Sequence, residues 1–444
     1  MNEKCKPFII NSNLCFENKD IASFDQYMQS TQFNIGNSYI SYSLIKEICG
    51  EFKKVPHIQN IYYYDFSNVN RDIDFINSEC SHVFFVIQDF IRIEEFPLPY
   101  EQLLSMFKKI NKPLIVVGIG ANAFSGFDKN LHKKLKPIVV KFLKYLSERC
   151  VQIGVRGYYT QEVLSNLGIN NAAPIGCPSF YEMGLNRYVN KKNIDANYYC
   201  ENENPILISG GFANKYLLNS YQICQDFQET NIIKAIAFND FNSPFTNYQL
   251  DKIFDHKYRA FSSIKDWQNF VSKFKLTIGH RVHGAIISVN AGVPAICLNS
   301  DARAAEMCAL LHIPVHKNVK YDTDILKIYE TIDVDAMNNS YPALYQQYVE
   351  LLRKNGIEVP NMTNDNNTQN DIQPHLKLYQ NFKNSETWEL QMRIKAVNAK
   401  LYVIESKLKP QNKVSLLEKI FSIKNQNNHK IIRFLGIKLK FRRK

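Results

Sequence analysis

The sequence predicts an α/β protein made of two domains that each contain a parallel sheet. Short apolar stretches typical of buried strands alternate with amphipathic stretches typical of helices, which is the pattern of a parallel sheet covered on both faces. The alternation is interrupted by the polar stretch NRYVNKKNIDANYYCENENP (186–205) and then restarts. Hydrophobic residues make up 45% of the 444 residues and aromatic residues 13%, so global disorder is excluded and a sizeable core is expected.

The elements of the first half follow in a regular order. We expect strands at 6–11, 82–90, 113–119, 151–155 and 172–176. Between them we expect helices at 33–50, 99–110, 131–149 and 158–168, the first ending near Gly50 and the last ending at Gly168 as a C-cap.

The second half repeats the pattern and then becomes helical. Strands are expected at 206–209, 232–240, 275–279 and 295–298, and helices at 212–229, 267–274 and 283–290. From this we predict two Rossmann-like domains facing a cleft (1–190 and 200–335), a closing helix (336–360), a polar linker (361–374), and a heptad helix with a basic tail (375–444).

Positive charge is concentrated at the C-terminus. Residues 411–444 contain ten Lys or Arg and one acid, Glu418, for a net charge of +9, which leaves only +3 of the total +12 for the rest. A nucleic-acid enzyme usually spreads basic residues along its binding face, so a nucleic-acid partner is not expected. The tail instead favours contact with an anionic surface such as the inner membrane leaflet, as an edge strand or an interfacial segment.

Six apolar residues before the tail recur at spacings of four and three, namely Leu390, Ile394, Val397, Leu401, Ile404 and Leu408. This seam predicts either self-association through 390–408 or a helix folded back on its own body, and the spacing does not separate the two.

The sequence gives little support for a membrane-spanning or secreted protein, or for a metal site or a disulfide framework. No apolar run reaches the roughly 18 residues of a spanning helix, and the apolar stretch near the N-terminus is too short for a secretory signal, so we expect a cytoplasmic protein. The ten cysteines contain no C-x-x-C pair, which favours buried reduced thiols over a zinc site or a disulfide framework. No metal site or resident cofactor is predicted.

The stretch TIGHRVHGAIISVNAGVPAIC (277–297) carries the strongest functional signal. His280, Arg281 and His283 lie between a buried strand and a buried helix, at the carboxyl edge of the sheet, and Gly284 permits a close backbone approach. A helix N-terminus already carries partial positive charge, so these cations oppose the helix dipole unless an anion binds there. The alternative is that Arg281 pairs with a nearby carboxylate and the histidines only cap the helix.

Two further clusters are expected at the same edge. Arg156 in GVRGYY ends a strand and begins a helix in the first domain, although a structural salt bridge explains it equally well. SDARAAEM brings Asp301, Arg303 and Glu306 after the last clear strand, with Asp301 alternatively serving only as the N-cap of a helix through Ala309. In FNIGNSY, Gly36 and Asn37 begin the first long helix; no G-x-G-x-x-G is present.

The ordered set N-I-G-N, G-V-R-x-x-Y, G-C-P-S-F, H-R-V-H-G with A-G-V-P, and S-D-A-R-x-x-E-M resembles the polysaccharide pyruvyl transferase family over about residues 30 to 315. The resemblance implies a two-domain, GT-B-like architecture and transfer of the enolpyruvyl carbons of phosphoenolpyruvate to a sugar, which leaves a pyruvate ketal on a bacterial surface polysaccharide. It implies that Arg156, Arg281 and His283 occupy donor-binding and catalytic positions. His280, Val282 and Cys177 depart from the usual residues, Cys177 standing where many members have an acid.

Together, the motifs and the resemblance lead to a mechanistic hypothesis. Arg156, His280, Arg281 and Gly284 bind phosphoenolpyruvate as a co-substrate, and His283 is the general acid. Asn37, Asp301, Arg303 and Glu306 form an acceptor or secondary group, with Asp301 or Glu306 as the base for a sugar hydroxyl. Whether the acceptor glycan is lipid-linked, nucleotide-linked or polymeric stays open.

Two alternative functions stay open beside this one. The first is a GT-B glycosyltransferase, similar to a sialyltransferase, that uses a nucleotide sugar in the same cleft. The second is a non-catalytic scaffold of a glycan assembly complex, held by the heptads and the basic tail.

Overall fold

The protein is described here from a computed structural model. The structure describes residues 5–12, 34–61, 64–93, 99–122, 127–200, 203–210, 214–223, 225, 257–259, 261, 263–298, 301–316 and 319–360, and three strands between 421 and 442. The predicted strand at 232–240, the linker at 361–374 and the heptads at 390–408 lie outside the described residues.

The first domain is a parallel sheet of six strands in the order β2-β1-β3-β4-β5-β6. The strands are β1 (Pro7–Ile10), β2 (His57–Ile58), β3 (His82–Val86), β4 (Leu114–Ile119), β5 (Ile153–Val155) and β6 (Ala172–Pro174). Its helices are α2 (Ile35–Cys49), α3 (Val69–Glu79), α4 (Tyr100–Lys109), α5 (Leu131–Lys134), α6 (Pro137–Arg149) and α7 (Tyr158–Ser165). Along β3, Phe84 and Val86 join one apolar cluster while Val83 and Phe85 join another, so both faces of the sheet are covered.

The second domain is a parallel sheet of five strands in the order β11-β10-β7-β8-β9. The strands are β7 (Ile206–Ser209), β8 (Gln222–Ile223), β9 (Tyr258–Arg259), β10 (Leu276–Gly279) and β11 (Ala295–Cys297), and the helices are α10 (Ile264–Val271), α11 (Val282–Asn290), α12 (Ala302–Leu310) and α13 (Ile325–Glu330). The chain order reverses between β7 and β10, and the carboxyl ends of strands at such a switch point are where open α/β sheets bind ligands. The expectation of two Rossmann-like α/β domains is confirmed.

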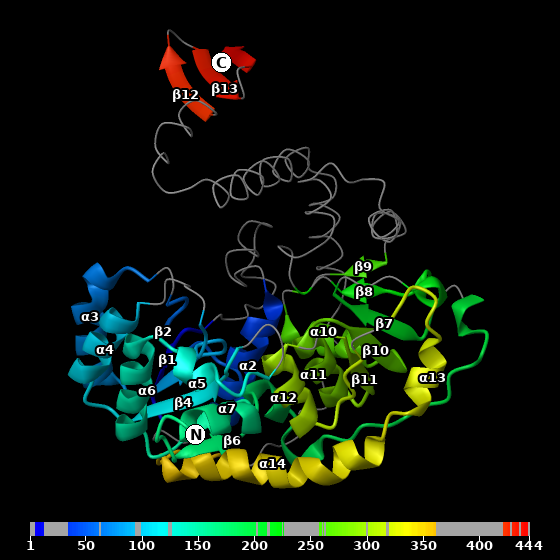
Figure 1. Cartoon of the computed structure of the whole chain (residues 1–444), viewed down its shortest axis with the longest axis horizontal. Helices are drawn as coiled ribbons and strands as arrows, with labels where there is room; N and C mark the ends of the chain where they lie inside the picture. Colours follow the sequence, from blue (N-terminus) through cyan, green and yellow to red (C-terminus); the bar gives the residue numbers. More distant parts are fainter. Residues whose placement is uncertain are drawn as a thin grey trace. The chain divides into compact units, whose positions relative to one another are not determined.

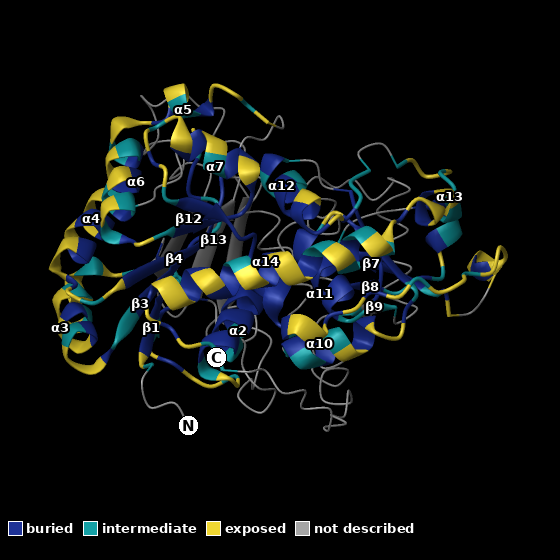
Figure 2. Ribbon diagram, turned by 90° about the horizontal axis from the view of Figure 1, so that it is seen from below, coloured by how far each residue is buried: buried dark blue, intermediate teal, exposed yellow. Residues whose placement is uncertain are grey.

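Helix α14 (Val334–Lys354) runs beneath both sheets (Figure 1). Seen from below, its outer surface is exposed and its inner surface is buried (Figure 2). Tyr341 donates a hydrogen bond to the carbonyl of Phe180 at 3.2 Å, and Tyr345 donates one to Glu47 of α2 at 2.7 Å. Helix α14 therefore holds α2 and the turn after β6 in place.

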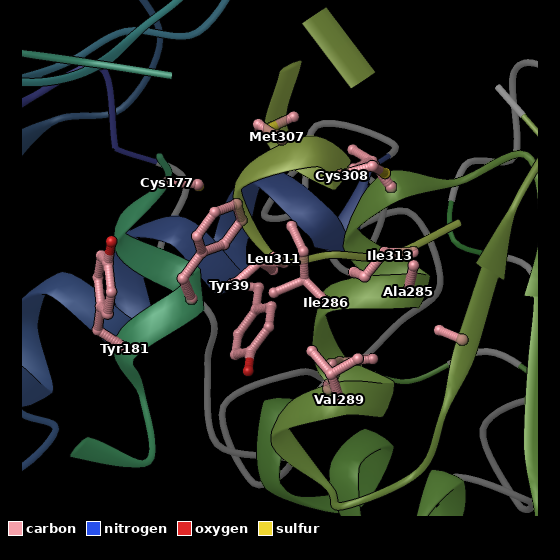
Figure 3. Close-up of a cluster of buried hydrophobic side chains, with 14 of the residues drawn as sticks. Tyr39, Cys177, Tyr181, Ala285, Ile286, Val289, Met307, Cys308, Leu311 and Ile313 are labelled. Carbon is pink, nitrogen blue, oxygen red and sulfur yellow. The ribbon is translucent and has the colours of Figure 1, made fainter. Parts of the chain in front are cut away.

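One continuous apolar cluster joins the two domains. It includes Tyr39 from α2, Ile286 and Val289 from α11, and Met307 and Leu311 from α12 and the turn after it (Figure 3). Asn290 reinforces this contact, since its amide donates hydrogen bonds to the Tyr39 hydroxyl at 2.6 Å and to the Ser179 carbonyl at 2.7 Å. Because the same residues form the core and the domain contact, the two sheets are held together by apolar burial.

Two predicted helices are wrong in extent. The single helix expected at 131–149 is divided into α5 and α6, because Pro137 occupies the first turn of α6 and holds Lys136 in an extended conformation. The helix expected at 212–229 is absent from the residues described there, where a short 3-10 turn (Lys215–Leu217) is followed by β8. The apolar residues of YLLNSYQI (216–223) pack as a turn and a strand, since a short apolar run does not by itself distinguish strand from helix.

The described part of the C-terminal extension is β structure, at the basic tail for which the sequence predicted an edge strand or an interfacial segment. Strands β12 (Phe421–Gln426), β13 (His429–Phe434) and β14 (Ile437–Arg442) form an antiparallel sheet of their own. They belong to a second compact unit, residues 231–246 and 384–444, distinct from the unit that contains both Rossmann-like domains.

Within the described ranges, no helix has the length and apolar character needed to cross a membrane. The cysteines described there are free thiols, and most of them are buried.

Glu47 in α2 gives the fold a testable pH dependence. Burial raises the pKa of this carboxyl from 4.5 to about 7, although the Tyr345 hydroxyl donates to it. Since the folded state then binds a proton more tightly than the unfolded state, the free energy of unfolding falls as the pH rises from about 4.5 to about 7. In Glu47→Gln we expect the fall in the free energy of unfolding that Glu47 causes, roughly 1 to 3 kcal/mol, to disappear. Thermal melts of both proteins at pH 5 and pH 8 measure it.

Glu350→Gln is the matched control, because Glu350 lies on the exposed surface of α14 in an ion pair with Lys354. We expect its pH dependence to equal that of the wild type. If Glu47→Gln also follows the wild type, the carboxylate is charged in the folded protein throughout this range.

Candidate active site

A pocket of about 250 Å³ opens between the two domains. The first domain contributes residues at the start of α2 and after β3 and β5, and the second domain contributes residues after β8 and β10 and on α12. The lining residues are Asn34, Asn37, Gln88, Asp89, Arg156, Gln225, His280, Arg281, Val282, His283 and Arg303. The structure thus brings together most of the residues singled out in the sequence, at the carboxyl edges of both sheets.

Arg281 begins α11 at the pocket. It is the N-cap residue, and its side chain makes no cap hydrogen bond because a guanidinium has no acceptor atom. The first amide of α11 to bond within the helix is that of Ala285, to the Arg281 carbonyl at 3.2 Å. The amides of the preceding turn, which carry the positive end of the helix dipole, lie next to the pocket. His280 also lines the pocket and is exposed.

Gly284 is not a lining residue but permits the geometry. A Cβ atom at this position would lie 1.7 Å from the hydroxyl oxygen of Ser209, at the end of β7. Only glycine therefore allows the first turn of α11 to lie directly against the end of the central strand, β7. This close contact fixes the positions of Arg281 and His283.

Arg156 is a buried cation, with an exposed fraction of 2%. Its Nε donates to the carbonyl of Gly118 at 3.0 Å, and its Nη1 lies 3.6 Å from the Asp89 carboxylate. A charge this deeply buried needs a partner, and Asp89 provides it. Arg156 is also one of the residues that line the pocket.

Asp89 links the arginines of the two domains. Its carboxylate contacts Arg156 of the first domain and forms a closer ion pair with Arg303 of the second. Sequence reasoning missed Asp89, although an acid directly after the apolar strand in HVFFVIQDF was a usable signal, because side chains that follow parallel strands collect at one edge. Among the described residues that line the pocket, Asp89 is the sole carboxylate.

Arg303 lies between two carboxylates. It pairs with Asp89 and, through Nη2 at 3.1 Å, with Asp301. The Asp89 carboxylate is the main cause that raises the pKa of the Arg303 guanidinium above its usual value. Arg156 and Arg303 thus share Asp89, and Arg303 also pairs with Asp301.

His283 lies at the centre of this group and is buried. Its Nε2 is 3.9 Å from the thiol of the fully buried Cys177, and the Ser179 hydroxyl donates to that thiol at 3.1 Å. Burial, followed by the charges of Arg156, Arg303 and Arg281, lowers the pKa of His283 well below 6.5. These effects favour the neutral imidazole.

Asp301 and Glu306 do not line the pocket. Asp301 is the N-cap of α12, accepting from the Ala304 amide at 2.7 Å, which was the alternative considered for it. Glu306 reaches into the first domain, where it accepts from the amide of Thr160 at 3.0 Å and from its hydroxyl at 2.7 Å. Burial raises its pKa to about 7. Glu306 thereby caps α7 from the other domain, a role that depends on tertiary contact.

The start of α2 completes the pocket. Asn34 caps the helix by accepting from the Gly36 amide at 2.9 Å, and the Ile35 amide donates across the domain boundary to the Gln225 carbonyl at 3.2 Å. Asn37, predicted from the sequence, lines the pocket, whereas Asn34, Gln88 and Gln225 were not singled out. Gln225 follows β8, which the sequence had assigned to a helix.

No group of three or more His, Cys, Asp or Glu side chains suited to a metal ion occurs among the residues placed by the structure.

The role of Asp89 can be tested with a neutral side chain of the same size. In Asp89→Asn, Arg156 and Arg303 lose a shared carboxylate, and removing one partner of a buried ion pair costs about 3–5 kcal/mol. We expect a lower Tm in phosphate-free buffer, and a larger rise in Tm on adding inorganic phosphate than the wild type shows, because the anion replaces the missing charge.

Asp128→Asn is the matched control, since Asp128 pairs with the exposed Lys134 on the surface. It should change neither value. An equal response of Asp89→Asn and wild type to phosphate would contradict the assigned charge balance.

No curated protein matches the sequence significantly. Among solved structures, a putative UDP-N-acetylglucosamine 2-epimerase from Listeria monocytogenes is similar at 12% identity and a TM-score of 0.39, over 82% of this chain and 100% of the other. The UDP-GlcNAc 2-epimerase of Methanocaldococcus jannaschii is similar at 13% identity and a TM-score of 0.40, over 78% and 99%.

A family model described as polysaccharide pyruvyl transferase matches residues 30–302, the part of the chain that holds Arg156, Arg281 and His283. The match extends over more than half of the sequence. The chain belongs to the polysaccharide pyruvyl transferase family and is a transferase enzyme.

Proposed function

We propose that this transferase uses phosphoenolpyruvate as its donor and forms a pyruvate ketal on a sugar of a bacterial surface polysaccharide. Family membership supports pyruvyl transfer, and the pocket supports the donor. Phosphoenolpyruvate carries a carboxylate and a phosphate, so it presents two anionic groups at a fixed separation. Arg156 and Arg281 come from different domains and line one pocket, which suits a ligand with two anionic ends.

The observation that carries this proposal is the N-terminus of α11. At the other three helices that begin near the pocket, an oxygen acceptor satisfies a first-turn amide: Asn34 at α2, Glu306 at α7 and Asp301 at α12. At α11 the cap is Arg281, a residue type that is disfavoured at this position because it cannot accept a hydrogen bond. An anionic ligand can accept hydrogen bonds from the first turn of α11, which the Arg281 side chain cannot do.

His283 is the proposed general acid. It gives a proton to C3 of phosphoenolpyruvate, C2 becomes electron-poor, and one sugar hydroxyl forms a bond to C2 while its proton returns to the imidazole. A second hydroxyl then forms the other C2–O bond as the bond from C2 to the phosphate oxygen breaks. The proton of that hydroxyl leaves with the phosphate. The products are the cyclic ketal and inorganic phosphate, so protons and oxygen atoms balance.

The acceptor sugar enters from the side of α2 and α12 in this proposal. Asn37 and Arg303 line the pocket there and offer polar groups to sugar hydroxyls. Both oxygens of Glu306 accept hydrogen bonds from Thr160, and Asp301 is bonded to the Ala304 amide and to Arg303. For this reason neither is assigned the role of base.

Donor identity is tested by thermal-shift titration in phosphate-free buffer with phosphoenolpyruvate, CMP, UDP and GDP. We expect stabilisation by phosphoenolpyruvate. In Arg281→Ala the affinity should fall by about 10- to 100-fold, because a charge-assisted hydrogen bond contributes about 1.5–3 kcal/mol.

Arg71→Ala, which removes an exposed arginine on α3, should bind the donor as the wild type does. Stabilisation by a nucleotide instead of phosphoenolpyruvate would replace this proposal with a nucleotide-sugar transferase. Loss of glycan assembly on deleting 375–444, together with full function of Arg281→Ala, would favour the scaffold.

The acid role of His283 is tested by turnover. In His283→Ala we expect kcat to fall by about 10²- to 10⁴-fold, the usual contribution of a general acid, with little change in donor affinity. In His280→Ala we expect a weaker donor affinity and a nearly unchanged kcat, because His280 lies at the pocket wall and donates no proton. Phosphate release with a glycan acceptor measures both. Full turnover in His283→Ala, with loss in Arg281→Ala, would remove the acid role.

A further inference from the structure

The C-terminal sheet separates its residues by chemistry. Residues paired across an antiparallel sheet share a face, and residues alternate between faces along each strand. The registers place the pairs Phe421–Phe434, Ile423–Ile432, Phe434–Ile437 and Ile432–Leu439 on one face, together with Phe441. Only Asn425 and Lys430 interrupt this face, so it is almost entirely apolar.

The opposite face is cationic. The registers place Arg433 opposite Lys438, Ile431 between Lys424 and Lys440, and His429 opposite Arg442. The three strands contain no acidic residue. Like charges directly opposite each other destabilise a sheet, so Arg433 and Lys438 oppose folding unless an anion lies over them.

The apolar face also requires a cover. A sheet of three short strands depends on the burial of its apolar face for stability. The environment must therefore be apolar on one side of the sheet and anionic on the other.

We propose that strands β12 to β14 form a binding surface for an anionic lipid leaflet. A leaflet offers hydrocarbon and phosphate as adjacent layers, and an amphipathic element lies at their boundary with its apolar face about 5–10 Å deep and its basic residues among the headgroups. The apolar face of this sheet lies in the acyl region, and Lys424, Arg433, Lys438, Lys440 and Arg442 meet the lipid phosphates. The strands belong to the compact unit that does not contain the pocket, so this inference is independent of the proposed donor.

The test is sedimentation of the full-length protein with vesicles of phosphatidylcholine containing about one-third phosphatidylglycerol, beside vesicles of phosphatidylcholine alone. We expect binding to the anionic vesicles that weakens as salt increases. In the triple variant Lys438→Gln, Lys440→Gln and Arg442→Gln, binding should fall by about 100-fold, because each basic residue near an anionic leaflet contributes about fivefold.

The matched control removes the same number of charges elsewhere: Lys133→Gln, Lys141→Gln and Lys144→Gln, which are exposed on α5 and α6. It should bind vesicles as the wild type does. A further variant, Ile437→Ser with Leu439→Ser, keeps every charge and should also bind weakly, since it removes apolar residues from the acyl region. The phosphoenolpyruvate-induced thermal shift should be equal in all variants, which separates this inference from the donor proposal.

Several results would overturn the inference. These are no binding to anionic vesicles, equal binding to both kinds of vesicle, or an equal loss in the control variant. A dimer in solution that the Ile437→Ser, Leu439→Ser variant abolishes, without vesicle binding, would assign the apolar face to a second copy of the chain.

Discussion

The compensation of positive charge at the domain boundary is the constraint on which the site depends. Arg156, Arg281 and Arg303 meet where four helices present their positive ends, and within the described part of the chain Asp89 pairs with Arg156 and Arg303 while Asp301 pairs with Arg303. Such a group of cations separates unless anions hold it together. Asp89 fulfils this in the unliganded protein by contacting an arginine from each domain. The pair that stabilises the domain contact is thus the pair that a donor anion competes with.

The contact between the two domains also depends on the ends of the helices that begin at the site. Glu306 of α12 caps α7, and the Gln225 carbonyl receives the first amide of α2, so each domain satisfies backbone groups of the other. Gly36 and Gly157 make this possible, because a Cβ at either would lie 2.7 Å from His283 or from Glu306. The absence of side chains at these two positions is therefore required by the packing of the domains rather than by any turn.

Local pattern was sufficient to predict much of the site. Arg156, Arg281 and His283 follow apolar strands and precede helices, and that arrangement places them at one edge whatever the details of packing. Glu306 was expected at the pocket, because the sequence around a residue does not show that it caps a helix in another domain. Asp89 is the third residue after the end of β3 and has no motif around it. The helix predicted at 212–229 is wrong for a different reason: its apolar residues suit either period, and the local sequence does not reveal that β8 pairs with β7 and β9.

A neutral His283 is consistent with a role as general acid, because binding of the proposed donor raises the pKa of its imidazole. Burial and three arginines hold the pKa of His283 well below 6.5, which favours the neutral imidazole over the imidazolium. A ligand with two or three negative charges, bound to the same arginines, cancels the repulsion that lowers that pKa and favours the imidazolium instead. Protonation of His283 is then coupled to donor binding, and the uncharged thiol of Cys177 beside it adds no opposing charge. In the proposed mechanism the acid therefore forms only when the donor that receives its proton is bound.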